Sequence, residues 1–178
     1  MGTIHRILVP VDFSEPSRRA LDYAAKLARP LGAAIDVLHV AEVPAFVPSA
    51  SMPEAGASDL SLVALVREGA DKMLTQFVVE AAARGIVVQA SRLELGSPAR
   101  VITELAVAGD YDLIVIGTHG RTGLTRALMG SVAERVVRHA PCPVLSVRPC
   151  AAPDPARPTL NTRIPCQNEH LGRGQVIG

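Results

Sequence analysis

The sequence predicts an α/β domain built on a parallel sheet with helices on both faces. Short apolar segments rich in β-branched residues alternate along the chain with segments of helical periodicity. Parallel strands need long crossover connections, and right-handed crossovers place helices above and below the sheet. After the last apolar segment the chain becomes polar and loses its periodicity. These observations predict one domain over residues 1–149 and a disordered tail over 150–178.

The first part of the chain predicts a strand, a helix and a second strand. Residues 4–11 form a short apolar run, as expected for a buried parallel strand. A helix is predicted over 15–31, where apolar residues recur at helical spacing between Ser14, a favourable N-cap residue, and Gly32. Residues 33–40 are again apolar and strand-like, so they predict the second strand.

The middle of the chain predicts a loop, a long helix, a strand and a third helix. Prolines punctuate a loop that extends to about residue 58, and an apolar stripe predicts a helix over 59–84. Partial alternation over 86–95 predicts a strand with one less buried face. Ser97 and the proline after it have the chemistry of a helix start, so a helix is expected from there to residue 109.

The last predicted elements are two strands with a helix between them. The most apolar segment, 111–116, predicts a strand that ends at Gly117, and a helix is expected over 130–139. The final strand is predicted over 143–148.

Composition argues against several classes of protein. Lys and Arg number 18 against 17 Asp and Glu, and aromatic residues make up only 3%, so the charge and stacking platforms of nucleic-acid-binding proteins are missing. No apolar run reaches the roughly 18 residues that cross a bilayer. The first residues lack the apolar segment of a secretory signal, so we expect a cytoplasmic protein without a membrane partner. The cysteines lack CxxC spacing, which predicts reduced thiols rather than disulfides or a metal site.

The clearest chemical signal lies between the strand 111–116 and the helix after it. This segment begins at Gly117, contains further glycines and opens the helix with Gly130 and Ser131. Glycine lets a backbone approach a ligand closely, and the free N–H groups at a helix start favour a phosphate. The spacing fits neither a P-loop nor the dinucleotide-binding GxGxxG pattern. The residues alone therefore leave two interpretations open, a phosphate cradle and a structural turn.

The spacing of these glycines is similar to a known nucleotide-binding pattern. Gly117-x2-Gly120-x9-Gly130-Ser131 resembles the ATP-binding pattern G-x2-G-x9-G-S/T of the universal stress protein family. The resemblance covers about residues 4–148 and includes three further segments, LVPVDFS at 8–14, IVIGTHG at 114–120 and APCPVLSV at 140–147.

This resemblance implies an open five-stranded parallel sheet in the order 3-2-1-4-5, the adenine nucleotide alpha hydrolase-like arrangement. It places the ligand where the first and fourth strands separate. General physics agrees, because the crevice of a doubly wound sheet lies outside the carboxyl ends of the strands where the strand order reverses. Asp12 ends the first strand and Gly117 follows the fourth, so both are expected to face this crevice.

The resemblance also implies which residues surround the base and the sugar. Asp12 is expected to bind the ribose hydroxyls, two valines to lie near adenine, and the backbone after the fourth strand to line both groups. A solvated turn residue or a helix N-cap is the alternative for Asp12, and plain core packing is the alternative for the valines. The residues expected in this part of the site are Pro10, Val11, Asp12, Val40, Ile116 and Gly117.

The phosphates are expected against the glycine-rich segment and the helix after it. Main-chain N–H groups would hold them, with the Ser131 hydroxyl as an extra donor and Arg121 adding charge. His119 could in principle activate water, but no orienting carboxylate stands beside it in the sequence, so no catalytic residue is predicted. The residues expected in this part of the site are His119, Gly120, Arg121, Gly130, Ser131 and Val132.

The resemblance implies a regulatory protein that binds ATP or another adenine nucleotide. Mg²⁺ or Mn²⁺ would be held mainly by the phosphates, since no metal-binding residues are predicted. The alternative is a slow ATP hydrolase or autophosphorylating protein, which the missing catalytic base and carboxylate pair disfavour. A homodimer is expected through the edge strand Pro143 to Arg148, whose backbone groups lack a partner on one side, and the resemblance implies the same. The alternative is that Pro143 and the tail cover this edge.

Overall fold

The computed structural model describes residues 3–42, 56–118 and 129–148. The tail that the sequence predicts to be disordered lies outside these residues. The elements follow in the order β1 (Arg6–Val11), α1 (Glu15–Leu31), β2 (Ala34–Ala41), α2 (Gly56–Ala83), β3 (Ala90–Leu95), α3 (Pro98–Ala108), β4 (Leu113–Gly117), α4 (Ser131–His139) and β5 (Val144–Val147).

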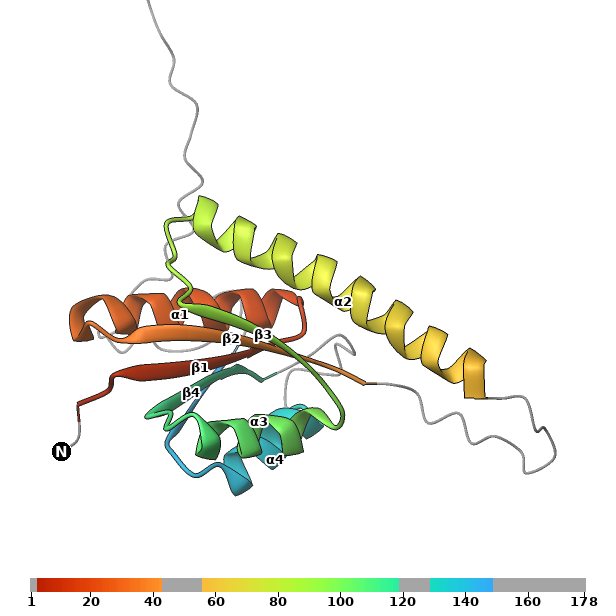
Figure 1. Ribbon diagram of the computed structural model, residues 1–178. Helices are drawn as coiled ribbons and strands as arrows, with labels where there is room; N and C mark the ends of the chain where they lie inside the picture. Colours follow the sequence, from red (N-terminus) through yellow and green to blue (C-terminus); the bar gives the residue numbers. More distant parts are fainter. Residues whose placement is uncertain (1–2, 43–55, 119–128, 149–178) are drawn as a thin grey trace, which may run out of the picture. The chain divides into compact units, whose positions relative to one another are not determined.

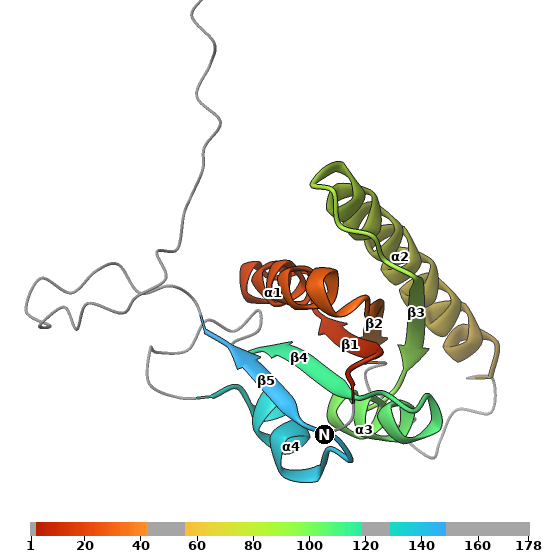
Figure 2. The ribbon, with the colours of Figure 1, turned by 90° about the vertical axis from the view of Figure 1, so that its left-hand side faces the viewer.

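The strands form one parallel sheet in the order β3-β2-β1-β4-β5. This confirms the predicted α/β class and strand order. Helices α1 and α2 cover one face of the sheet, and α3 and α4 cover the other (Figures 1 and 2). Strands β3 and β5 form the two edges.

The predicted strand over 86–95 is too long at its start, because pairing with β2 begins only at Ala90. The segment before it still contributes to the core, since Ile86 is buried while its neighbour Val87 is 80% exposed. Alternation of apolar and exposed residues there marks a connection that packs onto the sheet, rather than a strand paired within it. The other predicted elements differ from the structure only by one to three residues at their ends.

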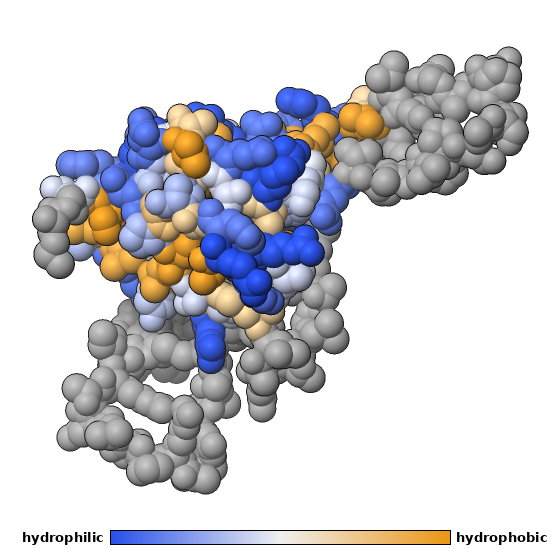
Figure 3. All heavy atoms as spheres, turned by 90° about the horizontal axis from the view of Figure 1, so that it is seen from below, coloured by the Kyte–Doolittle hydropathy of each residue, from blue (hydrophilic) through white to orange (hydrophobic). Residues whose placement is uncertain are grey.

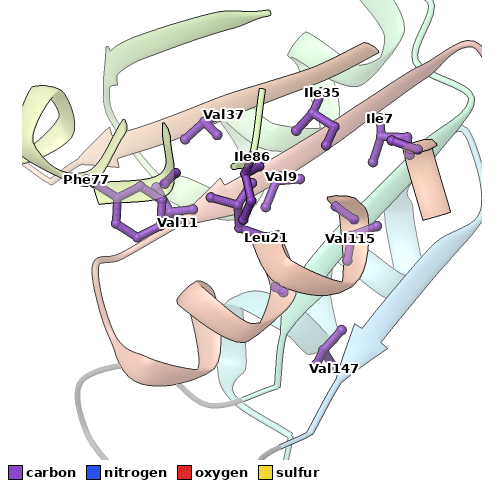
Figure 4. Packing of buried hydrophobic residues seen from close by; sticks show 14 of the residues in the cluster. Ile7, Val9, Val11, Leu21, Ile35, Val37, Phe77, Ile86, Val115 and Val147 are labelled. Atoms are coloured by element: carbon purple, nitrogen blue, oxygen red, sulfur yellow. The ribbon is translucent and has the colours of Figure 1, made fainter. Parts of the chain in front are cut away.

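The core has two layers because both faces of the sheet are covered. Alternate residues of one strand enter different layers, so Val9 packs with Phe77 towards α1 and α2, while Leu8 packs with Ile102 towards α3 and α4. Figure 4 shows the first of these layers around Val9, Val11 and Phe77. Burial on both faces explains why the central strands are mostly apolar and show no regular alternation of apolar and polar residues in the sequence.

A charged network closes the amino-terminal end of the sheet. Asp36, only 2% exposed, accepts hydrogen bonds of 2.7 Å from both the Arg6 guanidinium and the Tyr111 hydroxyl. Burial, and then the bond to Asp36, raises the pKa of Tyr111 to about 12. Beside it, the Asp112 carboxylate accepts the backbone N–H groups of His5 and Arg6, which lowers the pKa of Asp112 and joins the starts of β1 and β4.

The outer surface of α3 and α4 is mixed in character (Figure 3). Val107 and Val137 are exposed there, and ion pairs one turn apart, such as Arg100 with Glu104, lie nearby. Within the described residues, none of the helices has the length and hydropathy to cross a membrane.

Candidate functional site

The site lies where β1 and β4 separate. These strands pair only through Ile7 with Leu113 and Leu8 with Ile114, whereas β1 pairs with β2 along its whole length. Beyond Leu8 the carboxyl halves of β1 and β4 are no longer joined by ladder pairs, and a cavity of about 680 Å³ opens at the carboxyl ends of the strands. Its size is typical of small-molecule sites, which span roughly 300 to 1,000 Å³.

The turn from β1 into α1 forms one wall of this cavity. Asp12 Oδ1 accepts hydrogen bonds from the backbone N–H of Ser14, at 3.1 Å, and from the Ser14 hydroxyl. Ser14 in turn is the N-cap of α1, so the alternative that Asp12 itself caps this helix is wrong. Phe13, between them, has a φ of 66°, a left-handed conformation that bulky residues rarely adopt. The turn is therefore held in an unfavourable backbone conformation that presents Asp12 to the cavity.

His39 of β2 supports this turn from the neighbouring strand. Its Nδ1 lies 2.7 Å from the Val11 carbonyl, so Nδ1 carries the proton and donates it. The ring also packs against Phe13, with centroids 4.2 Å apart. His39 lines the cavity as well, which makes it a buried polar residue that links the strand end, the turn and the site.

Gly117, at the end of β4, brings the start of α1 close to the sheet. A Cβ atom at this position would lie 2.9 Å from the backbone carbon and oxygen of Pro16. The missing side chain is thus required by packing against α1. The sequence predicts that this glycine lets a ligand approach, whereas the structure gives a reason within the protein itself.

The start of α4 forms another part of the cavity wall. Gly130 is its N-cap, and its N–H donates to the Thr118 carbonyl at 2.7 Å. The expectation that this N–H points at a phosphate does not hold in this structure. The next three N–H groups, from Ser131 to Ala133, have no partner within the helix because of helix geometry. They are the groups that α4 can offer to an anion.

Three helix starts surround the cavity. Ser17 of α1, Pro98 of α3 and Ser131 of α4 all line it, and each helix N-terminus carries a partial positive charge. The charged side chains among the described lining residues are both acidic, Asp12 and Glu42. Positive potential from the described part of the wall thus comes from backbone dipoles rather than from Lys or Arg. The described residues contain no cluster of three or more His, Cys, Asp or Glu that could hold a metal ion.

Comparison with known proteins identifies the family of this chain. Residues 3–148 match the family model described as the universal stress protein family. The chain belongs to this family.

Individual universal stress proteins resemble the chain along most of their length. One from Methanocaldococcus jannaschii is 38% identical over 143 residues, which cover 80% of this chain and 81% of that relative. The solved UspA structure from Lactobacillus plantarum is 27% identical, has a TM-score of 0.69 and covers 83% of this chain and 100% of that one. A family protein from Arabidopsis thaliana, solved with AMP bound, is 22% identical with a TM-score of 0.51 over 81% of this chain and 91% of its own. At that identity it shows the shared fold.

The cavity of this universal stress protein brings together most of the residues singled out in the sequence. Those that line it are Pro10, Val11, Asp12, Val40, Ile116, Gly117, Gly130, Ser131 and Val132. The two valines also belong to the core, one in each layer, so core packing and cavity lining coexist at these positions. His119, Gly120 and Arg121 lie outside the described residues.

Several lining residues are not among those that the sequence predicts. Pro98, Thr118 and Ala133 could have been found, because each lies at a strand end or helix start that faces the same edge of the sheet. His39 carried a weaker signal, a polar residue within an apolar strand. The contribution of α2 carried none beyond a glycine in the middle of a helical segment, since its approach to the cavity depends on tertiary packing.

Proposed function

We propose that this universal stress protein binds an adenine nucleotide such as ATP in the cavity and acts as a nucleotide-dependent regulatory module. The observation that carries the proposal is the arrangement of two groups across the split between β1 and β4. The first-turn N–H groups of α4 lie on one wall, and the Asp12 carboxylate lies on the other. The N–H groups suit phosphates, and the carboxylate suits ribose hydroxyls.

Electrostatics supports an anionic ligand at the α4 end. Helix starts stabilise phosphates through unpaired N–H groups and the helix dipole, as Ser131 to Ala133 would here. Gly130 has a φ of −61° and a ψ of 147°, which any residue can adopt, so its backbone conformation does not explain why glycine stands there. A position without a side chain at the helix start fits close approach of a phosphate. The related protein solved with AMP lends further support. Mg²⁺ or Mn²⁺ would accompany ATP mainly through the phosphates.

The regulatory role without efficient catalysis, the homodimer through β5 and a cytoplasmic location belong to the same proposal. The homodimer is supported by the position of β5 at the sheet edge.

For catalysis, we expect ATP turnover far below the roughly 1 s⁻¹ that marks the lower end of ordinary enzymes. A phosphate-release assay at stoichiometric protein concentration measures this, and sustained turnover near that rate would favour the slow hydrolase instead.

Thermal denaturation with and without ATP tests the binding proposal. ATP at about 100 times its Kd stabilises a single-site protein by about 2.7 kcal/mol. For a chain of this length we expect a rise in Tm of about 5 to 10 °C. Mass analysis of nucleotide released from the purified protein identifies the natural ligand. A nucleotide-free protein whose Tm does not respond to ATP would contradict the proposal.

Asp12→Ala provides the matching site variant. We expect it to lose most of the ATP-induced rise in Tm, measured against its own ligand-free Tm, because the ribose contact is gone. Asp71→Ala, an exposed acidic position on α2 that does not line the cavity, serves as control and keeps the full rise. An equal rise in both variants would remove Asp12 from the site.

A further inference from the structure

Gly69 lies inside the 28-residue helix α2, where glycine is a poor helix former. Several other glycines among the described residues have a visible reason. Gly32 and Gly85 have φ values of 65° and 78°, and Gly117 packs on the backbone of Pro16. A Cβ at position 69 would meet nothing within 4 Å, and this position has no left-handed φ. Neither the backbone nor packing within the described residues accounts for glycine here.

The open space beside Gly69 belongs to the cavity, which Gly69 lines. Leu65 and Met73, four residues before and after it, line the same cavity and lie in one row along the helix. This row forms a notch, with a position lacking a side chain between two large ones. Leu65 is 66% and Met73 44% exposed, so both hold apolar surface in water that a ligand could cover.

We propose that this notch is the wall against which the flat base of the bound nucleotide lies. The inference rests on the proposed function and adds the element that receives the base. Neither side chain of the row, nor glycine, can form a strong hydrogen bond, so the row suits an aromatic face rather than a phosphate or sugar. A methionine thioether also makes favourable contacts with aromatic rings. The same continuous cavity carries the phosphate-binding N–H groups of α4 on another wall.

A side chain at position 69 tests this role of α2. Gly69→Leu fills the notch, and Gly69→Ala adds one methyl group while improving helix propensity. Thr75→Leu adds similar bulk at an exposed position of α2 that does not line the cavity, and serves as control. Calorimetric titration with ATP and with AMP gives the affinities, and thermal denaturation without ligand reports folding.

We expect Gly69→Leu to lower the affinities for ATP and AMP by a similar factor of at least ten, because both ligands carry the base. Gly69→Ala should lower both affinities about threefold while raising the ligand-free Tm, two opposite changes that a folding defect cannot produce. Thr75→Leu should keep wild-type affinities.

Two results would overturn the role of the notch while leaving the proposed function intact. One is ATP affinity in both Gly69 variants equal to that of the wild type. The other is a loss confined to ATP, which would place position 69 near the phosphates. Failure of the wild-type protein to bind either nucleotide would instead overturn the proposed function, and this inference with it.

Discussion

The physical reason for a glycine differs from one position of this fold to another. Gly117 was singled out in the sequence as part of a ligand-binding loop, and it does line the cavity, but contact with Pro16 explains why it has no side chain. A sequence shows where a glycine stands and not which atoms approach it. The sequence therefore predicts that Gly117 lies at the cavity, but it does not predict that contact with Pro16 is what requires glycine there.

Tyr111 gives a prediction about pH. Its pKa of about 12 in the folded protein exceeds the ordinary value of about 10. Between these values the folded state keeps the phenolic proton that the unfolded chain releases, so this residue's contribution to stability is full below pH 10 and is lost as pH rises towards 12. Tyr111→Phe lacks this titration. It also loses the hydrogen bond to Asp36, at a cost of about 1 to 3 kcal/mol.

Urea denaturation of both proteins at pH 9 and pH 11 checks this prediction. We expect the wild type to be more stable than Tyr111→Phe at pH 9 and the difference to shrink by pH 11. The other titrating groups are common to both proteins and largely cancel in the difference. A gap that stays constant between the two pH values would mean that Tyr111 titrates normally.

Two serines that look alike in the sequence cap their helices differently. Ser14 and Ser97 each precede a helix with proline in its first turn. The Ser14 hydroxyl accepts the Ser17 N–H at 3.4 Å and donates to Asp12, whereas the Ser97 side chain makes no capping hydrogen bond. The sequence predicted both helix starts correctly, but side-chain rotamers decide the bond and are set by tertiary contacts.

Ser14→Ala and Ser97→Ala form a matched pair of variants. We expect Ser14→Ala to lower the free energy of unfolding by about 1 kcal/mol and to weaken ATP binding, because Asp12 loses the hydroxyl that orients it. Ser97→Ala should change stability by less than about 0.5 kcal/mol. Chemical denaturation and ATP titration measure both effects. Equal losses in the two variants would show that the Ser14 hydroxyl has no special role.

The strand order and the position of the cavity followed from the sequence because they depend on patterns that span the chain. Alternating strands and helices gave the parallel α/β class, and the family resemblance gave the order with its reversal between β1 and β4. The row on α2 could not be predicted in this way. How closely a helix approaches a sheet edge is set by packing between elements, such as Phe77 against the layer around Val9.

The edge strand β5 carries the prediction about assembly. The carbonyls of Pro143 and Val147 accept hydrogen bonds of 3.0 Å from the backbone N–H groups of Ile114 in β4 and Thr118 just after it. Because a strand has a period of two, the backbone groups of Val144 and Ser146 point away from β4, towards the open edge. Ser146→Pro removes one outward donor and leaves the bonds to β4 in place. We expect it to convert a dimer to a monomer in sedimentation analysis, while Ser146→Ala remains dimeric. A dimer that survives Ser146→Pro would place the interface elsewhere.

The central claim is that a nucleotide binds between the start of α4 and the end of β1. A titration of ATP followed by ¹⁵N–¹H correlation spectroscopy tests it most directly, since each backbone amide reports its own surroundings. We expect the largest shifts at Ser131, Val132, Ala133 and Asp12, saturating at one ATP per chain. Signals from these residues that stay unmoved while ATP binds, with shifts gathered on another surface, would contradict the account.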